Sequence, residues 1–550
     1  MIFFLPHKKE SSTDFLMIKD TFLCIIKTMI NKKIKYILLS AFFPITAISQ
    51  KRPNIIIIYA DDMGYGDISC QNPDSKIFTP NIDNMACNGM RFTDAHSSSA
   101  ISSPSRYALL TGSYHWRRMH GIVNSFEPSV FKPSDITLPA VLKKTGYNTA
   151  CIGKWHLGWD WDSIKKPGAK VQKVKVDKKG TRIVPNTYKN AREVKYWPPS
   201  AFDWDKPISG GPIDRGFDYY FGDGTINFPP YAWIENDKFV TKPTADFDLN
   251  GQKTMEGLWE FRAGPMTPGW NPYNVLPTLT RKATEYIEKQ DAKTPFFLYF
   301  ALPSPHAPIL PTEEYRGKSH AGGYGDYVYQ TDAVVGEIIK AIEKKNLTNN
   351  TIVIFTADNG PERYAFKRAI KYGHFSTGEL RGIKRDLWEG GHRIPFIIKW
   401  PREIQKNTVC NEVISQVDLM ATLVSIAGGK LPKNSAPDSY DISCLWRKEK
   451  QTPLREATVQ NTKAGKYAIR RGKWIYIDNT TGEHTRMPKQ YKELRGYTSF
   501  STPDLLFDLS TDREQRINLY EKYPEIVTEM KELLKKYLNS KRTAPAILTQ

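Results

Sequence analysis

Residues 53–60, PNIIIIYA, form an uninterrupted apolar run that is rich in β-branched side chains. Such a run is typical of a strand that is buried on both faces of a parallel sheet. Similar runs occupy residues 296–302, 351–357 and 395–400, with a weaker one at 147–152, and helical patterns such as 327–345 lie between them. Strands that alternate with helices predict an α/β fold with a large, mostly parallel, doubly wound sheet flanked by helices.

Two segments of the sequence depart from this alternation of strands and helices, one within it and one after it. Residues 158–275 are rich in Trp, Pro, Gly and Lys and have little periodicity, which favours an insert that covers or binds something over simple surface decoration. Residues 430–452 are typical of a linker. They lead to a smaller α+β unit, 453–550, with a short antiparallel sheet and an amphipathic helix at 524–538. We therefore expect a main domain at 50–429.

The first 49 residues are typical of a leader. Lys32, Lys33 and Lys35 precede an apolar run that ends in Ala47-Ile48-Ser49, the layout of a secretory signal peptide. Because the run is shorter than the ~20 apolar residues that span a bilayer, release is favoured over stable membrane insertion. Met29 would be a normal start for such a signal, and an uncleaved amphipathic leader is the alternative. We expect an exported protein, periplasmic or secreted.

The composition is that of a folded globular protein, with 40% hydrophobic and 25% charged residues. The formal charge is +20, and the leader, with seven Lys and three acidic residues, accounts for +4 of it. A basic surface suits nucleic acid, anionic membranes or acidic substrates. No nucleic-acid motif or basic amphipathic helix supports the first two, so a polyanionic glycan is favoured.

The sharpest motif is SSPSRYALLTG at residues 102–112. Pro104 suits a first helical turn and Gly112 a helix end, which places Ser102 at the mouth of a short helix, where an anion is favoured. An ordinary capped helix would explain these features equally well. The string, however, resembles the signature of the type I sulfatases, C/S-x-P-S-R-x-x-x-L/M-T-G, and matches it at every specified position.

This resemblance to a family of the alkaline phosphatase-like superfamily extends over residues 52–540. Within the family, the sequence resembles bacterial arylsulfatases and N-acetylgalactosamine-6-sulfatase-like polysaccharide sulfatases. It implies that Ser102 is oxidised after translation to formylglycine, or 3-oxoalanine. The serine form of the signature implies a bacterial host and, as a partner, an anaerobic-type radical sulfatase-maturating enzyme.

Two pairs of oxygen-bearing side chains follow predicted strands. Asp61-Asp62 comes after the first strand, and Asp358-Asn359 after the strand at 351–357. Each pair precedes a glycine closely enough for ordinary turn chemistry to explain it alone. Hard oxygen ligands suit calcium, and the resemblance implies one Ca²⁺ held by these four residues together with the modified Ser102.

The resemblance also implies a pocket of cations for the sulfate group, formed by Arg106, Lys154, His156, His306 and Lys384. Hydration of the aldehyde at position 102 would give a diol, one hydroxyl of which attacks sulfur. We expect His306 to protonate the leaving oxygen, Lys154 and Lys384 to stabilise sulfuryl oxygens, and His156 to deprotonate the second hydroxyl. Candidate substrate contacts are His115, Trp116, Trp159 and His374.

Two other functions compete with hydrolysis of sulfate esters on a polysaccharide. A phosphomonoesterase or phosphodiesterase of the same superfamily would need two zinc ions, for which the additional histidines are missing. The second competing function is that of a catalytically inactive, glycan-binding relative in which Ser102 is never converted. The sequence does not identify the sulfated sugar; the candidates are an algal glycan such as ulvan, a glycosaminoglycan or mucin.

Overall fold

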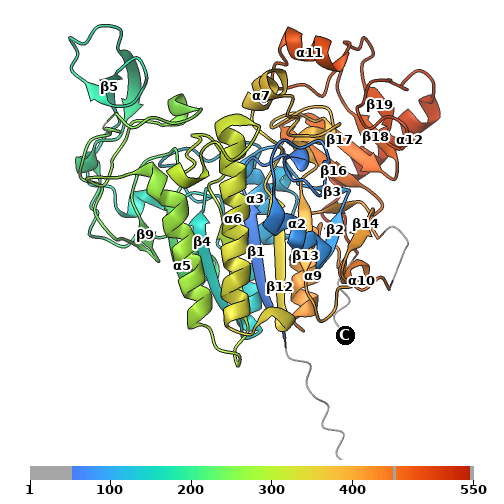
Figure 1. Ribbon diagram of the computed structural model, residues 1–550, viewed down its shortest axis with the longest axis horizontal. Coiled ribbons are helices and arrows are strands. Elements are labelled where there is room, and N and C mark those ends of the chain that lie inside the picture. The colour runs from blue at the N-terminus through green and yellow to red at the C-terminus, as the bar shows by residue number, and fades with distance from the viewer. Residues whose placement is uncertain (1–51, 250, 450–453, 546–550) are drawn as a thin grey trace, which may run out of the picture. The chain divides into compact units, whose positions relative to one another are not determined.

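A computed structural model describes residues 52–249, 251–449 and 454–545 (Figure 1). The predicted leader, with its alternative start at Met29, and the last three residues of the predicted linker lie outside this part of the chain. From Arg52 onward the chain forms one compact unit.

The core of the protein is a ten-stranded sheet in the order β10-β9-β8-β4-β11-β1-β12-β13-β2-β14. Its five middle strands are parallel, and β1 lies between β11 and β12, so that Ile57 pairs with both Tyr299 and Ile354. The middle strands are β8 (Tyr219–Gly224), β4 (Asn148–Lys154), β11 (Phe296–Ala301), β1 (Asn54–Ala60) and β12 (Thr351–Ala357). The predicted mostly parallel α/β sheet is therefore confirmed.

The outer strands depart from the parallel pattern. Strand β13 (Phe396–Lys399) is antiparallel to both of its neighbours, β12 and β2 (Met90–Phe92). Its apolar run resembles those of the parallel strands because it too is buried on both faces, and periodicity carries no information on strand direction. The other outer strands are β9 (Ile234–Glu235), β10 (Lys238–Phe239) and β14 (Thr408–Cys410).

Helices cover both faces of the sheet, which explains why β1 has no polar face. Ile55 and Ile57 pack in the cluster that includes residues of α4 (Leu138–Lys144) and α9 (Asp418–Ile426). Ile56 and Ile58 pack in the opposite cluster, with residues of α2 (Pro80–Cys87), α5 (Val275–Lys289) and α6 (Gly322–Lys344). Figure 1 shows α5 and α6 in front of the sheet.

The C-terminal part contains the predicted short antiparallel sheet and helix. Its strands, in spatial order, are β16 (Thr458–Lys463), β17 (Lys466–Arg471), β18 (Trp474–Ile477) and β19 (Leu505–Asp508). Helix α12 (Pro524–Asn539) packs on one face, through Val527, Met530 and Leu534. On the other face Leu387 and Trp388, which precede the main-sheet strand β13, join the same core as Ile475.

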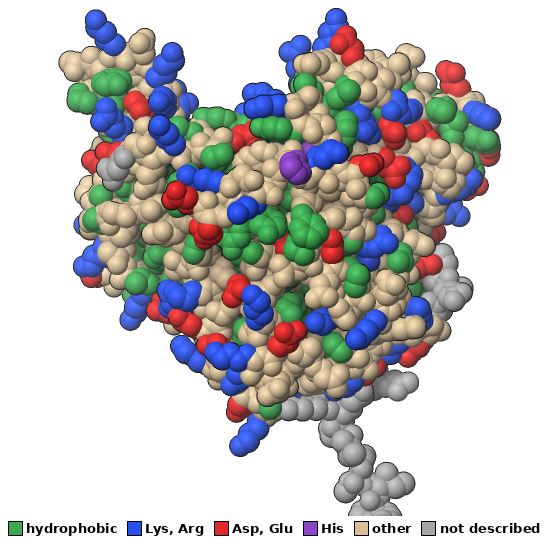
Figure 2. All heavy atoms as spheres, viewed as in Figure 1, with side chains coloured by type: hydrophobic (Ala, Val, Ile, Leu, Met, Phe, Trp, Pro, Cys, Tyr) green, Lys and Arg blue, Asp and Glu red, His purple; other side chains and the backbone are tan. Residues whose placement is uncertain are grey.

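The segment at 158–275 carries a small antiparallel sheet of its own, made of β5 (Gln172–Val176), β6 (Ile183–Val184) and β7 (Arg192–Tyr196). In Figure 1 this sheet projects at the end of the molecule toward which β1 runs, opposite α11 (Lys489–Arg495). Figure 2 shows that the surface is hollowed between these two projections, and that basic and acidic side chains are interspersed over this face without a continuous basic stripe.

The remaining regular elements are short. They are β3 (Ala95–His96), which pairs with β15 (Ile414–Ser415), α3 (Ser102–Thr111), α7 (Tyr364–Tyr372), α8 (Glu389–His392) and α10 (Ser443–Trp446). Among the described residues, no helix combines the length and the apolar character that crossing a membrane requires.

Candidate active site

Ser102 is the first residue of α3, and its side chain is buried. The helix ends at Gly112, whose φ of 61° is the left-handed conformation that glycine adopts without strain. Both ends of the predicted helix are thus where the motif placed them. The hydroxyl of Ser102 donates to Asp61 Oδ1 at 3.2 Å and approaches Asn359 Oδ1 at 3.5 Å.

The oxygen-bearing pairs after β1 and β12 lie side by side, because these strands are adjacent and parallel. The backbone N–H of Asp62 donates to Asp358 Oδ1 at 3.0 Å, and Asn359 Nδ2 donates to Asp62 Oδ1 at 2.8 Å. All four side chains, those of Asp61, Asp62, Asp358 and Asn359, are buried. Three carboxylates in one buried place require compensating positive charge.

Three buried cations supply that charge. Lys154, the last residue of β4, places Nζ 2.5 Å from Asp61 Oδ2, and Lys384 Nζ lies 2.7 Å from Asp62 Oδ2. Arg106, one turn after Ser102 in α3, is 2.8 Å from Asp358 Oδ2. The structure therefore brings together three of the predicted cations and three of the predicted metal ligands.

The pKa values follow from this charge balance. Burial would raise the pKa of Asp61, but Lys154 and Arg106 outweigh it and lower the pKa. Burial would lower the pKa of Lys384, but Asp62 and Glu362 outweigh it and raise the pKa. Burial lowers the pKa of Lys154 despite the nearby Asp61 carboxylate.

The two predicted catalytic histidines are held by backbone carbonyls. His156 Nε2 lies 3.0 Å from the carbonyl oxygen of Val123, which can only accept, so in the neutral ring Nε2 carries the hydrogen and Nδ1 is the basic nitrogen. Burial, followed by Lys154 and Arg106, holds the pKa of His156 well below its ordinary value of 6.5. His156 is therefore neutral near pH 7, as a general base must be.

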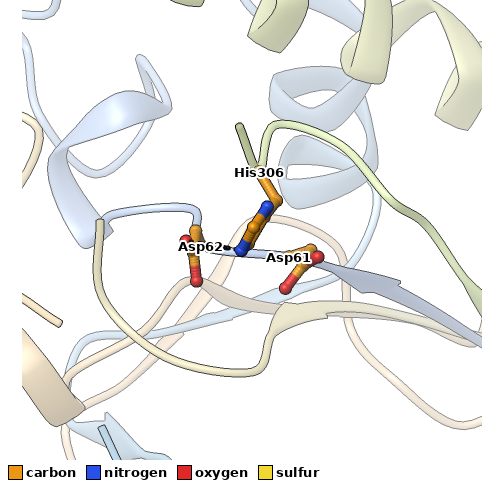
Figure 3. Close-up of side chains that lie close together, drawn as sticks. All are labelled: Asp61, Asp62 and His306. Atoms are coloured by element: carbon orange, nitrogen blue, oxygen red, sulfur yellow. Dashed lines mark ion pairs between the residues drawn. The ribbon is translucent and has the colours of Figure 1, made fainter. Parts of the chain in front are cut away.

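His306 points toward the carboxylates, and its Nε2 lies 3.6 Å from Asp62 Oδ2 (Figure 3). Its Nδ1 contacts the carbonyl oxygen of Ala307. Burial, partly opposed by Asp62, lowers the pKa of His306 to about 3. Of the described residues, Asp61, Asp62 and His306 have ligand atoms within 4.8 Å of one another, a spacing that a metal ion could bridge.

A pocket of about 410 Å³ opens beside Ser102. His156, His306 and Lys384 line it, so the nucleophile position and three of the five residues predicted for the sulfate pocket face one cavity. A cavity of this size has room for a sugar in addition to its sulfate group. The arrangement can bind an anion, hold a cation among carboxylates and move protons on two imidazoles.

Other residues that line the pocket were not identified from the sequence. Glu362 pairs with Arg385 through two oxygens, at 2.8 and 2.9 Å, and lies 3.6 Å from Lys384 Nζ. Arg262 packs over the ring of Phe228, 3.8 Å from its centroid. The proximity of Glu362 to Asp358-Asn359 in the sequence was the only available hint.

The four candidate substrate contacts do not line this pocket. His115 is buried and bonded to Asn461 Oδ1 at 2.9 Å, and His374 is buried and bonded to Asp67 Oδ1 at 2.8 Å. Trp116 packs on Tyr114, and Trp159 lies in the core on one side of the sheet. These side chains already have structural partners, so we no longer expect them to contact a substrate in this cavity.

Comparisons with known proteins agree with this geometry. The family described as Sulfatase matches residues 53–429, and the one described as N-sulphoglucosamine sulphohydrolase, C-terminal, matches residues 383–542. An N-acetylgalactosamine-6-O-sulfatase of Bacteroides thetaiotaomicron is 33% identical, over 88% of this chain and 93% of that protein. Human arylsulfatase A is 29% identical, over 88% and 87%.

Solved structures show the same fold. One from the glycosaminoglycan metabolism of Bacteroides thetaiotaomicron has a TM-score of 0.72 and 29% identity, and covers 89% of this chain and all of that one. A sulfatase from Pseudoalteromonas sp., at 20% identity, covers 92% and 93% with a TM-score of 0.64. The signature helix, its setting and these matches together show that the chain belongs to the sulfatase family and is a sulfuric ester hydrolase.

Proposed function

We propose that this protein, after oxidation of Ser102 to formylglycine, hydrolyses O-sulfate esters on a glycosaminoglycan-type sugar, with N-acetylgalactosamine 6-sulfate as the first substrate to test. The observation that carries this is the placement of Ser102 Oγ 3.2 Å from Asp61, at the wall of a sugar-sized pocket lined by cations. The 33% identity to an N-acetylgalactosamine-6-O-sulfatase over most of both chains supports the choice of sugar.

The proposal includes one calcium ion. Asp61, Asp62, Asp358 and Asn359 offer only oxygen donors, which calcium prefers, and the three carboxylates are buried together. Bound there, calcium would offset the carboxylate charge and favour ionisation of the nucleophile. The modified side chain would supply a hydroxyl that attacks sulfur and a second one whose deprotonation releases sulfate.

The roles of the protein's own groups follow from their bonds. Nδ1 of His156 is free to accept a proton because Nε2 donates to Val123. Lys154 and Lys384 offer their N–H groups to sulfuryl oxygens. His306 is neutral before substrate binds, and the negative charge of a bound ester favours its protonation. It then donates that proton to the leaving oxygen.

The test uses protein made together with a radical sulfatase-maturating enzyme, the partner proposed here. Mass spectrometry of the peptide that contains Ser102 should show the loss of two hydrogen atoms. The matured protein should release sulfate from N-acetylgalactosamine 6-sulfate, and Ser102→Ala should abolish this. A converted, calcium-loaded protein that hydrolyses no sulfate ester would overturn the proposal, and an unconverted one would favour a non-catalytic glycan-binding role.

We also propose that the protein is exported. The basic and apolar pattern of residues 32–49 supports this, and sulfated glycans are extracellular polymers. Fractionation of the producing cells, with and without residues 1–49, would test it.

A further inference from the structure

The pocket beside Ser102 has one wall that comes from the C-terminal sheet. Thr462 and Lys463 end strand β16, and His484 follows β18, and all three line the same cavity as Ser102 and His306. No part of the sulfate chemistry described above uses these three side chains.

This wall is held in place by a network around Asn461. Its Nδ2 donates to the carbonyl oxygens of Lys463, at 2.8 Å, and Lys466, at 2.6 Å, which fixes the turn between β16 and β17. Its Oδ1 bonds with His115 Nε2 at 2.9 Å, which ties the turn to the segment that follows the signature helix. The wall is therefore preorganised before any ligand binds.

One side-chain polar atom of each of Thr462 and His484 in this wall has no hydrogen-bond partner in the protein. The Thr462 side chain is buried, and its Oγ1 makes no hydrogen bond, and the same holds for the buried Nε2 atom of His484. Lys463 is exposed and takes part in no ion pair among the residues that the structure describes. Buried polar atoms without partners are uncommon and call for an explanation.

The other cations of the pocket are already engaged. Arg385 is bound by both oxygens of Glu362, and Arg262 packs on Phe228 and donates to Asn124 Oδ1 at 2.9 Å. Lys384 pairs with Asp62. Among the described residues, Lys463 and Arg262 are the pocket cations without a carboxylate partner, and Lys463 is the one that lies on the wall formed by the C-terminal sheet, away from the groups that receive the sulfate ester.

We propose that Thr462, Lys463 and His484 form a subsite for a second anionic group of the substrate. The inference rests on the proposed function and narrows its substrate class to glycans with two negative charges near one another. The second group is either the carboxylate of an adjoining uronate or a second sulfate ester on the same sugar. Burial, followed by Lys466 and Lys463, lowers the pKa of His484, so a neutral imidazole can donate a hydrogen bond there.

The experiment compares four substrates of the matured enzyme. N-acetylgalactosamine 6-sulfate has one anionic group, and its 4,6-disulfate has a second sulfate. The disaccharide in which the 6-sulfated sugar is joined to glucuronate has a carboxylate, which its methyl ester lacks. In Lys463→Ala, we expect the ratio of kcat/KM between a two-anion substrate and its one-anion counterpart to fall about tenfold, mainly through KM, as the loss of a charge-assisted hydrogen bond requires.

The matched control is Lys466→Ala, which removes the same charge from the same turn but from a side chain that does not line the pocket. Because the Lys466 charge also acts on His484 but its side chain does not reach the pocket, this variant should lower the ratios less than Lys463→Ala does, and Lys463→Arg should retain most of the discrimination. If Lys463→Ala lowers kcat/KM for the disulfate alone, the subsite binds a sulfate group. If it lowers kcat/KM for the disaccharide but not for its methyl ester, the subsite binds a carboxylate.

Unchanged ratios in Lys463→Ala, or an equal effect of Lys466→Ala, would overturn the subsite and leave the proposed function standing. Hydrolysis of 4-methylumbelliferyl sulfate by the wild-type enzyme distinguishes failure of the subsite from failure of the proposed function, because this ester measures sulfate ester hydrolysis without a sugar. If neither this ester nor any of the four sugars is hydrolysed, the proposed function fails and the subsite fails with it.

Discussion

At the scale of single residues, the site is a balance of buried charges, and Arg106 is one of its fully buried members. It neutralises Asp358 at 2.8 Å and lies 3.4 Å from Asp61, while its guanidinium carbon sits 5.1 Å from the centroid of Tyr59. Its Nε and Nη1 atoms have no hydrogen-bond partner in the protein. Arg106 leaves these two N–H donors without partners while it contacts two buried carboxylates. We infer that its positive charge, and not its packing, is what the site requires.

We therefore expect Arg106→Met to lower the free energy of unfolding by about 3–5 kcal/mol in calcium-free buffer, because it leaves buried carboxylates uncompensated. Chemical denaturation would measure this. Arg281→Met is the control, since Arg281 pairs with Glu285 on an exposed helix surface. That change should cost about 0.5 kcal/mol or less. Equal costs for the two variants would contradict the argument.

Sequence reasoning at this scale succeeded where short motifs carry the residues. Ser102, Asp61, Asp358, Lys154 and Lys384 converge because each stands in a motif whose position on the fold is fixed. Lys463 and Arg262 were missed because they come from loops and strand ends without a pattern. His115 was predicted as a substrate contact because it stands near the signature, and its structural partner, Asn461, some 350 residues away in the sequence, could not be inferred from that position.

At the scale of elements, helix α3 must be placed accurately, because Ser102 and Arg106 both depend on it. The helix ends at Gly112 in the left-handed conformation, and a Cβ added there would lie 2.8 Å from Ala436 Cβ and 3.0 Å from Met420 Cβ. Glycine is thus required twice, for its backbone angle and for close packing. Gly373, which ends α7, shares the angle, with φ of 63°, but a Cβ there would meet nothing within 4 Å.

This pair of glycines gives a matched test. Gly373→Ala should cost about 1–2 kcal/mol of stability, the cost of a left-handed alanine. Gly112→Ala should cost about 1–3 kcal/mol more because of the steric contacts. It should also lower kcat, since α3 must shift away from Ala436. Denaturation curves and sulfate release from an aryl sulfate would measure both effects, and similar results for the two variants would show that packing at Gly112 is unimportant.

The elements also show what periodicity can and cannot predict. The runs at 53–60, 296–302 and 351–357 gave parallel strands in the middle of the sheet, because burial on both faces leaves a continuous apolar run. The run at 395–400 has the same character for the same reason, yet β13 runs antiparallel. Direction is decided by the path of the chain between strands, here the segment from Asp358 to Arg393, which contains α7, Lys384 and α8, and not by the run itself.

At the scale of the whole molecule, a buried carboxylate is one of the contacts that join the main sheet to the C-terminal sheet. Glu389, the first residue of α8, contacts His96 of β3 at 3.0 Å, Arg393 at 2.5 Å and Gln460 of β16 at 2.9 Å. Arg470 of β17 lies 3.8 Å from the same carboxylate. The wall that carries Lys463 is thus anchored to the part of the chain that carries the catalytic groups.

This carboxylate should make the junction sensitive to acid. Burial would raise the pKa of Glu389, but Arg393 and His96 outweigh it and hold the pKa well below its ordinary value of 4.5. A carboxylate with a lowered folded-state pKa stabilises the protein above its unfolded pKa, and this contribution is lost as the pH falls from about 4.5 through the folded-state value.

Glu389→Gln should therefore lower the melting temperature at neutral pH, because Arg393 and Arg470 lose their buried counter-charge. The difference from wild type should stay constant down to about pH 4.5 and narrow below it, because the unfolded wild-type chain then takes up a proton that the folded state still excludes. Calorimetry or near-ultraviolet circular dichroism would follow this. Glu285→Gln, on an exposed helix surface, should show no such convergence, and a constant difference between Glu389→Gln and wild type would mean that the carboxylate contributes through shape alone.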